Sequence, residues 1–271
     1  MPAASGNQDG APPVANGFKR VMVDGHAATA ADLRHLAISN YGHFTAMQVR
    51  DGRVRGLDLH LARLDTANRE LFDRALDHGL VLEMIRAALG EDLKDASVRV
   101  YVVRTEEVHV VVTTGAPAPT PTTPQSLMPV SYQRFLPHIK HLGGFPQAYL
   151  RQRAGQGGFD EALLTTPDGT ISEGAITNIG CFDGTSVVWP DAPLLYGTAM
   201  RLVELGLARR GIPVERRPIR VADLPGYTAV FLTNSHGVAA VSRVGDTPLK
   251  IDEDFFATLL DCYEATPWDP I

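Results

Sequence analysis

The sequence is poor in cysteine and has no long apolar run. Its 271 residues include two cysteines, Cys181 and Cys262. They are too few for a disulfide scaffold and too far apart for a zinc knuckle. A membrane helix needs roughly 18 apolar residues, and the most apolar stretch, residues 80–89, is interrupted by Glu83 and Arg86. The first residues also lack the basic and then apolar order of a signal peptide, so we expect a cytoplasmic protein without a membrane span.

Basic charge is also scarce. The chain carries 25 Lys+Arg against 31 Asp+Glu, so its formal net charge is −6. This balance disfavours nucleic acid and anionic membranes as partners. Apolar residues make up 44% and charged residues 21% of the chain, which is typical of globular proteins with a sizeable core.

Several catalytic motifs are absent. The sequence contains no phosphate loop that ends in Gly-Lys-Ser/Thr, no Gly-x-Gly-x-x-Gly after a strand and no His-Glu-x-x-His. It has no Gly-x-Ser-x-Gly elbow either. His138 and His141 have a spacing that could bind a metal, but no third ligand is nearby. We therefore interpret them as solvated or hydrogen-bonded side chains and expect no metal site.

Two breaks in composition divide the chain. Residues 1–17 are small and Pro-rich, which is typical of a disordered tail. Prolines at positions 117, 119, 121 and 124 predict an extended linker over residues 116–126, because proline has no N–H for a β-ladder. We therefore predict a smaller domain at 18–115 and a larger domain at 127–271.

The hydrophobic periodicity predicts both helices and strands. Alternating valines at 97–103 and 108–112 predict a hairpin, and residues 44–54 predict another that turns at Asp51-Gly52. Helical spacing predicts a helix around 61–75 and a second one that ends near Gly90. In the second part we predict hairpin turns at 167–169 and 183–184, helices at 198–210 and 252–264, and a strand at 227–233. Tight turns between strands indicate an α+β fold with mixed or antiparallel sheets.

Lysine is rare, whereas arginine is common. The four lysines are Lys19, Lys94, Lys140 and Lys250. Three of them lie beside the tail, in a polar run or after a turn, and we expect these to be solvated. Lys140 instead lies between two apolar stretches, 135–137 and 142–145. An amine in apolar surroundings has a lowered pKa, which favours attack on an aldehyde near neutral pH. Lys140 is thus a candidate Schiff-base lysine, with a surface charge as the alternative.

Further segments extend the pattern around Lys140. Ile139-Lys140-His141-Leu142 is followed by the segments 159–164 and 168–174, and then by Asn178. In order and spacing, these segments resemble the signature of the class IV aminotransferases, the pyridoxal-phosphate enzymes of fold type IV. The resemblance extends from about residue 42 to 241 and has the Pro-rich linker where this family joins its two domains. It implies a small α/β domain, a large mixed-β domain with flanking helices, and pyridoxal 5′-phosphate as cofactor.

The resemblance also implies roles for three residues of the second domain. Lys140 would form the Schiff base with the cofactor and then move the Cα proton of the substrate. Glu173 matches the carboxylate that keeps the pyridine nitrogen of the cofactor protonated. Asn178 completes the Glu-x-x-x-x-Asn signature and is expected to contact nearby backbone.

Other matching positions concern the cofactor phosphate. Arg63, in His-Leu-Ala-Arg-Leu, is similar to the arginine that reaches this phosphate from the small domain. Ala199 and Met200 match two residues whose amides bind the phosphate at a helix N-terminus. Asn234 and Ser235 lie in a segment that resembles the second phosphate-contact loop.

The resemblance leaves the reaction open. Members of the family transaminate branched-chain L-amino acids, D-amino acids or (R)-amines, or cleave 4-amino-4-deoxychorismate to 4-aminobenzoate and pyruvate. The segment 42–46 favours this lyase, and in a lyase the Thr45 hydroxyl would relay a proton and make Thr45 a catalytic residue. Gln48 opposes the lyase, because it stands where arginine is common. We place transamination first, the lyase second and a catalytically silent cofactor-binding protein third. The family resemblance also implies a homodimer.

Overall fold

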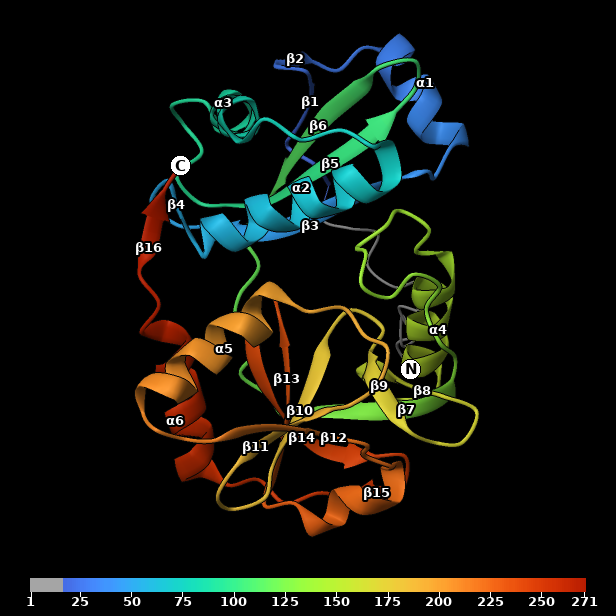
Figure 1. Ribbon diagram of the computed structural model, residues 1–271, viewed down its shortest axis with the longest axis vertical. Helices are drawn as coiled ribbons and strands as arrows, with labels where there is room; N and C mark the ends of the chain where they lie inside the picture. Colours follow the sequence, from blue (N-terminus) through green and yellow to red (C-terminus); the bar gives the residue numbers. More distant parts are fainter. Residues whose placement is uncertain (1–16) are drawn as a thin grey trace, which may run out of the picture.

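The computed structural model describes residues 17–271, arranged as two large sheets with their helices, one above the other, and a two-stranded sheet beside them (Figure 1). The predicted tail, residues 1–17, lies outside the described residues except for Gly17. Each half of the chain forms its own sheet, at 20–115 and at 125–248. The division into two domains stays a prediction.

The upper half contains a five-stranded sheet in the order β2-β1-β6-β5-β3, and every pairing in it is antiparallel. Its strands are β1 (Arg20–Val23), β2 (His26–Ala27), β3 (Gly42–Val49), β5 (Ala96–Arg104) and β6 (Val108–Gly115). The hairpin predicted from the alternating valines is confirmed as β5–β6. Every second residue of β5 is buried, as expected for strands with one face on a core.

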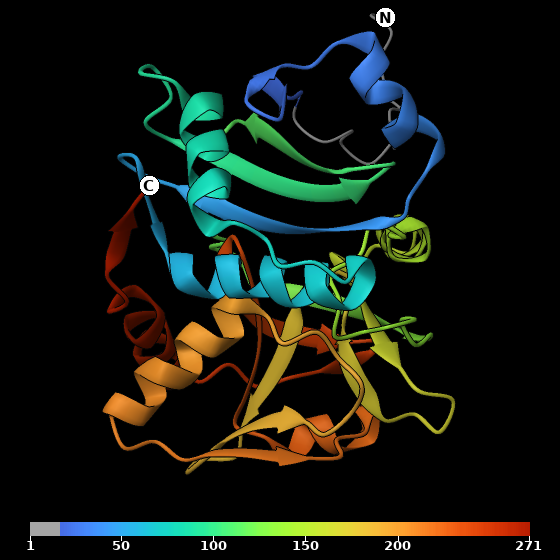
Figure 2. The ribbon, with the colours of Figure 1, turned by 45° about the horizontal axis from the view of Figure 1, so that its top comes forward.

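Three helices accompany this sheet: α1 (Ala30–Ile38), α2 (Leu57–Phe72) and α3 (His78–Leu89). The last two confirm the predicted helices. Asp77 caps α3 by accepting hydrogen bonds from two backbone N–H groups, and Gly90 ends it with a positive φ of 59°. Apolar side chains from α2 and α3 fill one core with β3, β5 and β6, so α2 lies along the sheet on the side of the lower half (Figure 2).

The lower half contains a nine-stranded mixed sheet in the order β12-β11-β10-β13-β14-β7-β8-β9, with β15 beside β14. Three pairings are parallel, β7 with β8, β7 with β14, and β11 with β12. The predicted hairpins are confirmed as β8–β9 and β10–β11. The strands are β7 (Gln125–Ser131), β8 (Glu161–Thr165), β9 (Ile171–Gly174), β10 (Asn178–Phe182), β11 (Val187–Pro190), β12 (Val214–Arg217), β13 (Ala229–Asn234), β14 (Gly237–Val244) and β15 (Thr247–Pro248).

Helices pack against this sheet at two groups of strands. The pair α5 (Thr198–Arg209) and α6 (Glu253–Glu264) packs on β13 and β14, whereas α4 (Phe145–Gln156) packs on β8 and β7. A short 3₁₀ helix, η1 (Val221–Gly226), precedes β13. The predicted helices at 198–210 and 252–264 are thus confirmed as α5 and α6. Among residues 17–271, no helix is long and apolar enough to span a membrane.

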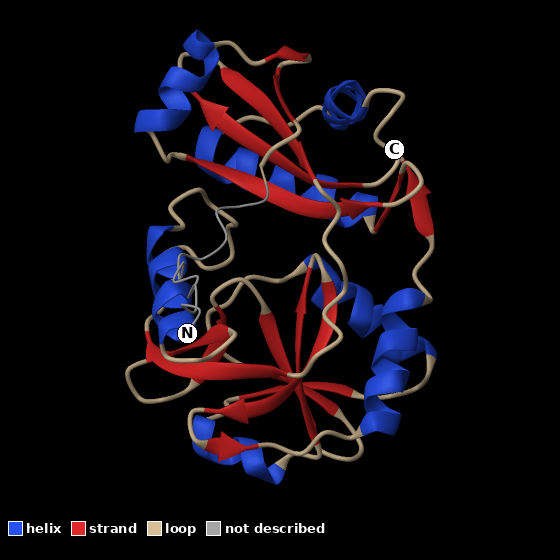
Figure 3. Cartoon of the chain, turned by 180° about the vertical axis from the view of Figure 1, so that it is seen from behind, coloured by secondary structure: helices blue, strands red, loops and turns tan. Residues whose placement is uncertain are grey.

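The chain crosses between the two halves at residues 116–124 and again near its C-terminus (Figure 3). After α6, the last strand, β16 (Trp268–Pro270), pairs with β4 (Arg53–Arg55) of the upper half. The carboxylate of Asp269 accepts a hydrogen bond of 3.0 Å from the backbone N–H of Leu57, the first residue of α2. The C-terminal segment therefore fastens the N-terminus of α2 to the lower half.

Two predicted boundaries differ from the structure. The turn at Asp51-Gly52 exists and is closed by an isolated bridge between Arg50 and Arg53, but the ladder of β4 is formed with β16 rather than with β3. This partner lies at the other end of the chain, which local periodicity cannot indicate. The Pro-rich segment is extended as predicted, but β7 begins at Gln125, inside the predicted linker.

Candidate active site

A cavity of about 420 Å³ lies between the two halves, and its lining comes from both. The upper half contributes β3, β4, β5 and α2, and the lower half contributes the Lys140 segment, α4, β9, the start of α5 and the β13–β14 turn. The C-terminal segment, which runs from the lower half to the upper, adds Tyr263 and Trp268. The lining contains one carboxylate, that of Glu173, and six cationic side chains: Arg55, Arg63, Arg99, Arg134, Lys140 and Arg151. Such a lining favours an anionic ligand.

Lys140 lies in the segment that joins the loop before α4 to the edge of β3. Its carbonyl accepts a hydrogen bond of 2.9 Å from the backbone N–H of Phe44, and His141 forms an isolated bridge with His43. The Lys140 amine is 4.9 Å from the centre of the Phe44 ring. Burial, with the nearby charges of Arg63 and Arg134, lowers the pKa of Lys140 to about 7. The amine is thus available in its neutral, nucleophilic form near neutral pH.

Glu173 is buried on β9, and its two carboxylate oxygens have different partners. Oε1 is 3.2 Å from a guanidinium nitrogen of Arg134, and Oε2 accepts a hydrogen bond of 3.2 Å from the backbone N–H of Leu195. Arg134 also donates to the carbonyls of Pro137 and Ile139, next to Lys140. Burial raises the pKa of Glu173, and Arg134 opposes this shift. Arg134 therefore holds the carboxylate and the lysine segment together.

Asn178 lies at the start of β10 and contacts the loop before α5. Its Nδ2 donates a hydrogen bond of 2.6 Å to the carbonyl of Leu195. A Cβ atom on Gly197 would overlap the Oδ1 atom of Asn178, so glycine is required there for space. The contact fixes the loop that leads into α5.

The N-terminus of α5 faces the cavity. No side chain caps this helix, and Thr198 and Ala199 line the cavity. The buried hydroxyls of Thr198 and Thr233 have no hydrogen-bond partner among the described residues. Free N–H groups, the helix dipole and unpaired hydroxyls together form a site for a phosphate. Met200, the next residue of α5, is fully buried and does not line the cavity with its side chain.

The β13–β14 turn adds Asn234 and Ser235 to the lining. The side-chain oxygen of Asn234 accepts a hydrogen bond of 2.8 Å from the backbone N–H of His236, which keeps the turn closed. Ser235 has no side-chain hydrogen bond within residues 17–271, so its hydroxyl is available for a ligand.

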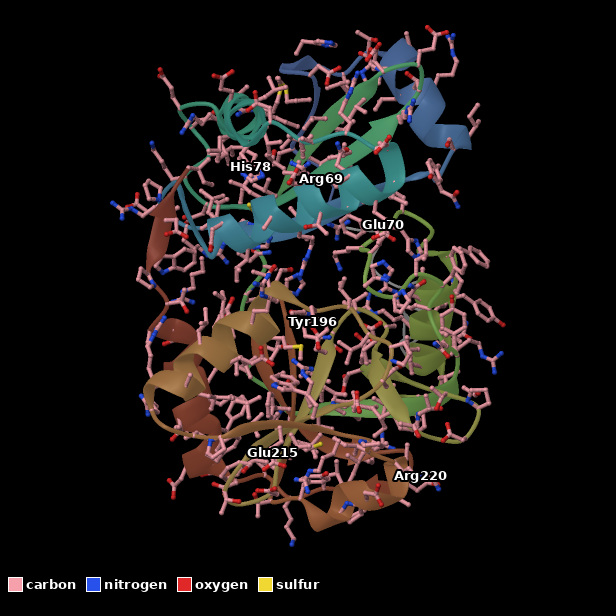
Figure 4. All side chains as sticks on the ribbon, in the orientation of Figure 1. Arg69, Glu70, His78, Tyr196, Glu215 and Arg220 are labelled. Carbon is pink, nitrogen blue, oxygen red and sulfur yellow. The ribbon has the colours of Figure 1, made fainter. Side chains whose placement is uncertain are left out.

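Arg63 reaches the same place from the upper half. Its guanidinium donates a hydrogen bond of 2.9 Å to the carbonyl of Tyr196, in the loop before α5. Figure 4 shows Tyr196 in this loop, below α2. Burial and the charge of Arg201 lower the pKa of Arg63 to about 10, which leaves it charged at neutral pH. The contact joins α2 to the N-terminus of α5.

Thr45 does not lie in the cavity. The residues of β3 that line it include Phe44, Ala46 and Gln48, whereas Thr45 points to the opposite face and is fully buried. Its hydroxyl is 2.6 Å from Nδ1 of His60 on α2. The Thr45 hydroxyl therefore meets the cavity only through His60, and its catalytic role in a lyase stays a prediction.

Gln48 faces the cavity but uses its amide on structural contacts. It donates to Ser97 at 2.8 Å and accepts from the backbone N–H of Ala118 at 2.8 Å. The cavity also contains residues that sequence reasoning missed, namely His60, Arg99, Arg134, Arg151, Tyr263 and Trp268. His60 was visible in the His-Leu-Ala-Arg-Leu segment, but no sequence signal distinguishes the others.

The two histidines near Lys140 have hydrogen-bond partners. Nε2 of His138 is 2.9 Å from the carboxylate of Glu70 on α2, and Nε2 of His141 is 2.9 Å from the carbonyl of Phe135. Over residues 17–271, no group of three His, Cys, Asp or Glu side chains could hold a metal ion. The interpretation of His138 and His141 as hydrogen-bonded side chains agrees with these contacts.

Comparison with known proteins identifies the family. Residues 42–244 match the family model of the amino-transferases of class IV. This is most of the chain. The chain belongs to the class IV aminotransferases. No curated protein sequence matches it.

Solved structures of other proteins share the fold of this class IV aminotransferase. A hypothetical aminotransferase from Mycobacterium tuberculosis, in its apo form, has a TM-score of 0.79 at 18% identity, over 91% of this chain and 98% of that one. The branched-chain amino acid aminotransferase from Escherichia coli has a TM-score of 0.78 at 16% identity, over 93% and 94%. A provisionally assigned 4-amino-4-deoxychorismate lyase from Legionella pneumophila has a TM-score of 0.75 at 16% identity, over 83% and 90%.

Family membership assigns pyridoxal 5′-phosphate to this chain as its cofactor, and the cavity fits this molecule. The chain is accordingly a pyridoxal-phosphate-dependent enzyme. The unpaired hydroxyls of Thr198 and Thr233, beside the uncapped start of α5, suit the phosphate. The buried carboxylate of Glu173 suits a protonated ring nitrogen, and the Lys140 amine suits the aldehyde. The donors, the acceptor and the nucleophile line one cavity.

Proposed function

We propose that this class IV aminotransferase transfers an amino group between an amino donor with a carboxylate and a keto acid, with Lys140 as the residue that attaches the cofactor. The observation that carries this proposal is the position of Lys140. Its amine has a pKa of about 7 and lies in the same cavity as the buried Glu173. A neutral amine and a carboxylate are the two protein groups that amine-transfer chemistry on an aldehyde cofactor needs.

Residues from both halves hold the phosphate of the cofactor in this proposal. Arg63 supplies a charged donor from α2, and Ala199 and Met200 supply backbone N–H groups at the start of α5. Ser235 and Asn234 close the opposite side with the β13–β14 turn. These groups stand in or beside one cavity, and the Arg63–Tyr196 hydrogen bond already joins α2 to the α5 loop. These donors and the cationic side chains of the lining would together stabilise the negative charge of a phosphate.

Glu173 would hold the protonated ring nitrogen of the bound cofactor with its carboxylate. When bound, the cofactor supplies a positively charged ring that withdraws electrons from the substrate Cα. Arg134 and the Leu195 N–H both stabilise the carboxylate in its charged form, against the effect of burial. Asn178 supports this site indirectly through the carbonyl of Leu195.

Lys140 moves the proton at the substrate Cα. With the cofactor and substrate bound, the free amine of Lys140 would accept the Cα proton and return it. A base works best when its pKa is near the working pH, and the pKa of Lys140, lowered to about 7, meets this condition. Because the amine sits over the Phe44 ring, the aromatic face limits the access of water from that side.

The charges of the cavity support a substrate with a carboxylate. Two arginines of the lining already form ion pairs with carboxylates: Arg134 with Glu173, and Arg151 with Glu161 at 3.3 Å. Arg99 has no side-chain hydrogen bond or ion pair with any residue in 17–271. An unpaired arginine in the lining favours an anionic group on the ligand. A substrate amine without a carboxylate would form no ion pair with Arg99.

An assay with an amino donor alone, followed by addition of a keto acid, distinguishes the proposed transamination from the lyase reaction. For transamination, an amino acid alone should remove the visible absorbance of the loaded protein, and a keto acid should restore it. Formation of 4-aminobenzoate from 4-amino-4-deoxychorismate, without any keto acid, would contradict the proposed transamination and assign the lyase activity instead. A protein that binds the cofactor but turns over neither would be catalytically silent. Lys140→Ala should abolish the reaction, whereas Lys250→Ala, on an exposed lysine, should not.

We also propose that the protein is a homodimer. The aromatic pair on α4, Phe145 stacked on Tyr149, is exposed, and so is Phe135 in the loop before α4. Exposed apolar groups of this kind are typical of contact surfaces. Light scattering should give about twice 29.3 kDa, and a fully active monomer would contradict the proposal.

A further inference from the structure

The contact between Thr45 and His60 is the shorter of two side-chain hydrogen bonds that join β3 to α2 in the described part of the chain, and it lies behind the cavity. Thr45 is fully buried, His60 is 4% exposed, and Thr45 Oγ1 and His60 Nδ1 are 2.6 Å apart. His60 lines the cavity, whereas Thr45 does not. Any effect of Thr45 on a ligand therefore passes through the imidazole ring.

The surroundings decide which of the two groups donates. The Thr45 hydroxyl has no other hydrogen-bond acceptor among the described residues. If His60 Nδ1 carried the proton, the hydroxyl hydrogen would be left unpaired in the core, at a cost of about 1–3 kcal/mol. If the hydroxyl donates to Nδ1, both groups are satisfied. The second arrangement leaves the proton of the neutral ring on Nε2.

The other ring nitrogen faces the cavity. Nε2 of His60 has no hydrogen-bond partner within residues 17–271, yet it is not among the buried polar atoms without a partner. It therefore stays accessible to the space that His60 lines. Burial and the charges of Arg63 and Lys140 lower the pKa of His60 to about 3, so the ring is neutral at any working pH. A neutral ring donates a hydrogen bond without adding to the positive charge.

We propose that Thr45 and His60 are positioning residues that act as a pair: the Thr45 hydroxyl fixes the ring, and Nε2–H donates into the cavity beside Lys140 and Arg63. The acceptor is an anionic oxygen of the bound cofactor. The proposal rests on the proposed function only for the identity of this acceptor. It gives Thr45 a role in ligand binding without a contact to the ligand.

The position of the proton can be measured in the protein without cofactor. With ¹⁵N-labelled histidine, His60 should show a protonated Nε2 and an unprotonated Nδ1 that do not change between pH 5 and pH 9. A protonated Nδ1, or titration of the ring in this range, would overturn the proposal. This measurement needs no substitution in Thr45 and no activity, so its failure leaves the proposed reaction untouched.

Binding tests the consequence for the ligand. Pyridoxine 5′-phosphate lacks the aldehyde, so its dissociation constant reports non-covalent contacts alone. Thr45→Val keeps the shape and removes the hydroxyl, and it should weaken binding about tenfold or more, which corresponds to about 1.4 kcal/mol. Thr45→Ser should restore binding to within about twofold of the original protein. Equal affinity of Thr45→Val and the original protein would contradict the proposal.

A second buried pair on the same strand and helix provides the matched control. Nε2 of His43 is 3.4 Å from Oδ1 of Asn68 on α2, and neither residue lines the cavity. His43→Leu should lower the melting temperature but leave the affinity for pyridoxine 5′-phosphate within about twofold. If His43→Leu weakens binding as much as Thr45→Val does, general loosening of the β3–α2 contact explains both, and the proposal is wrong.

Discussion

The titration of Lys140 is open to direct measurement, because the chain has four lysines. Burial and the charges of Arg63 and Arg134 lower the pKa of Lys140 from 10.5 to about 7. At pH 7 about half of the amine is then neutral, against about 1 in 3,000 for a lysine with its ordinary pKa. The structure therefore predicts a gain of roughly 1,500-fold in reactive amine at neutral pH.

The assay is ¹³C NMR of the protein without cofactor, labelled at the lysine Cε. Four signals are expected, and Lys140→Arg identifies the one that belongs to Lys140. This signal should shift with a midpoint near pH 7. A midpoint above pH 9 would refute the argument that burial and the neighbouring arginines prepare this amine.

Two substitutions of opposite sign test the cause of the shift. The carboxylate of Glu173 raises the pKa of Lys140, so Glu173→Gln should move the midpoint to lower pH. The charge of Arg63 lowers it, so Arg63→Gln should move the midpoint to higher pH. An unchanged midpoint in both variants would show that burial alone controls the titration, and shifts in the same direction would contradict the charge effects assigned to Glu173 and Arg63.

Three further predictions concern how the cavity is held together. Asp269→Ala removes the acceptor of the Leu57 N–H and should cost about 1 kcal/mol of unfolding free energy, measured by urea denaturation; an unchanged midpoint would contradict the role of the C-terminal segment in fastening α2. Arg63→Gln should weaken binding of pyridoxine 5′-phosphate about tenfold or more in a fluorescence titration, and unchanged affinity would exclude Arg63 from the phosphate site. Gly197→Ala brings a Cβ atom onto Asn178 and should lower the melting temperature by about 4–8 °C, from a cost of about 2 kcal/mol; a variant as stable as the original protein would show that the loop moves freely.

Local features of the fold could be predicted because the sequence encodes them within a few residues. Alternating valines define β5 and β6, and Gly90 marks the end of α3. The start of α5 follows Gly197, and the Asp183-Gly184 turn joins β10 and β11. In each case the signal and the structure lie in the same short segment.

Long-range pairings could not be predicted. Trp268 lies opposite Arg55 only because the chain returns to the upper half after α6. Arg134 meets Glu173 across the buried floor of the cavity, and no spacing in the sequence indicates an ion pair between them. Such contacts depend on how the two sheets are placed, which a single sequence does not encode locally.

Thr45 illustrates the same limit within one strand. Alternation places Phe44 and Thr45 on opposite faces of β3, which the sequence does predict. Which face meets the cavity and which meets α2 depends on the position of the lower sheet. In the structure Phe44 faces Lys140 and Thr45 faces His60.

The attachment of the cofactor at Lys140 is the central claim, and chemical trapping tests it most directly. The protein loaded with pyridoxal 5′-phosphate is reduced with borohydride, digested and mapped by mass spectrometry. The account predicts one modified peptide, which contains Lys140, and none after Lys140→Ala. Modification at Lys19, Lys94 or Lys250 in place of Lys140 would contradict it.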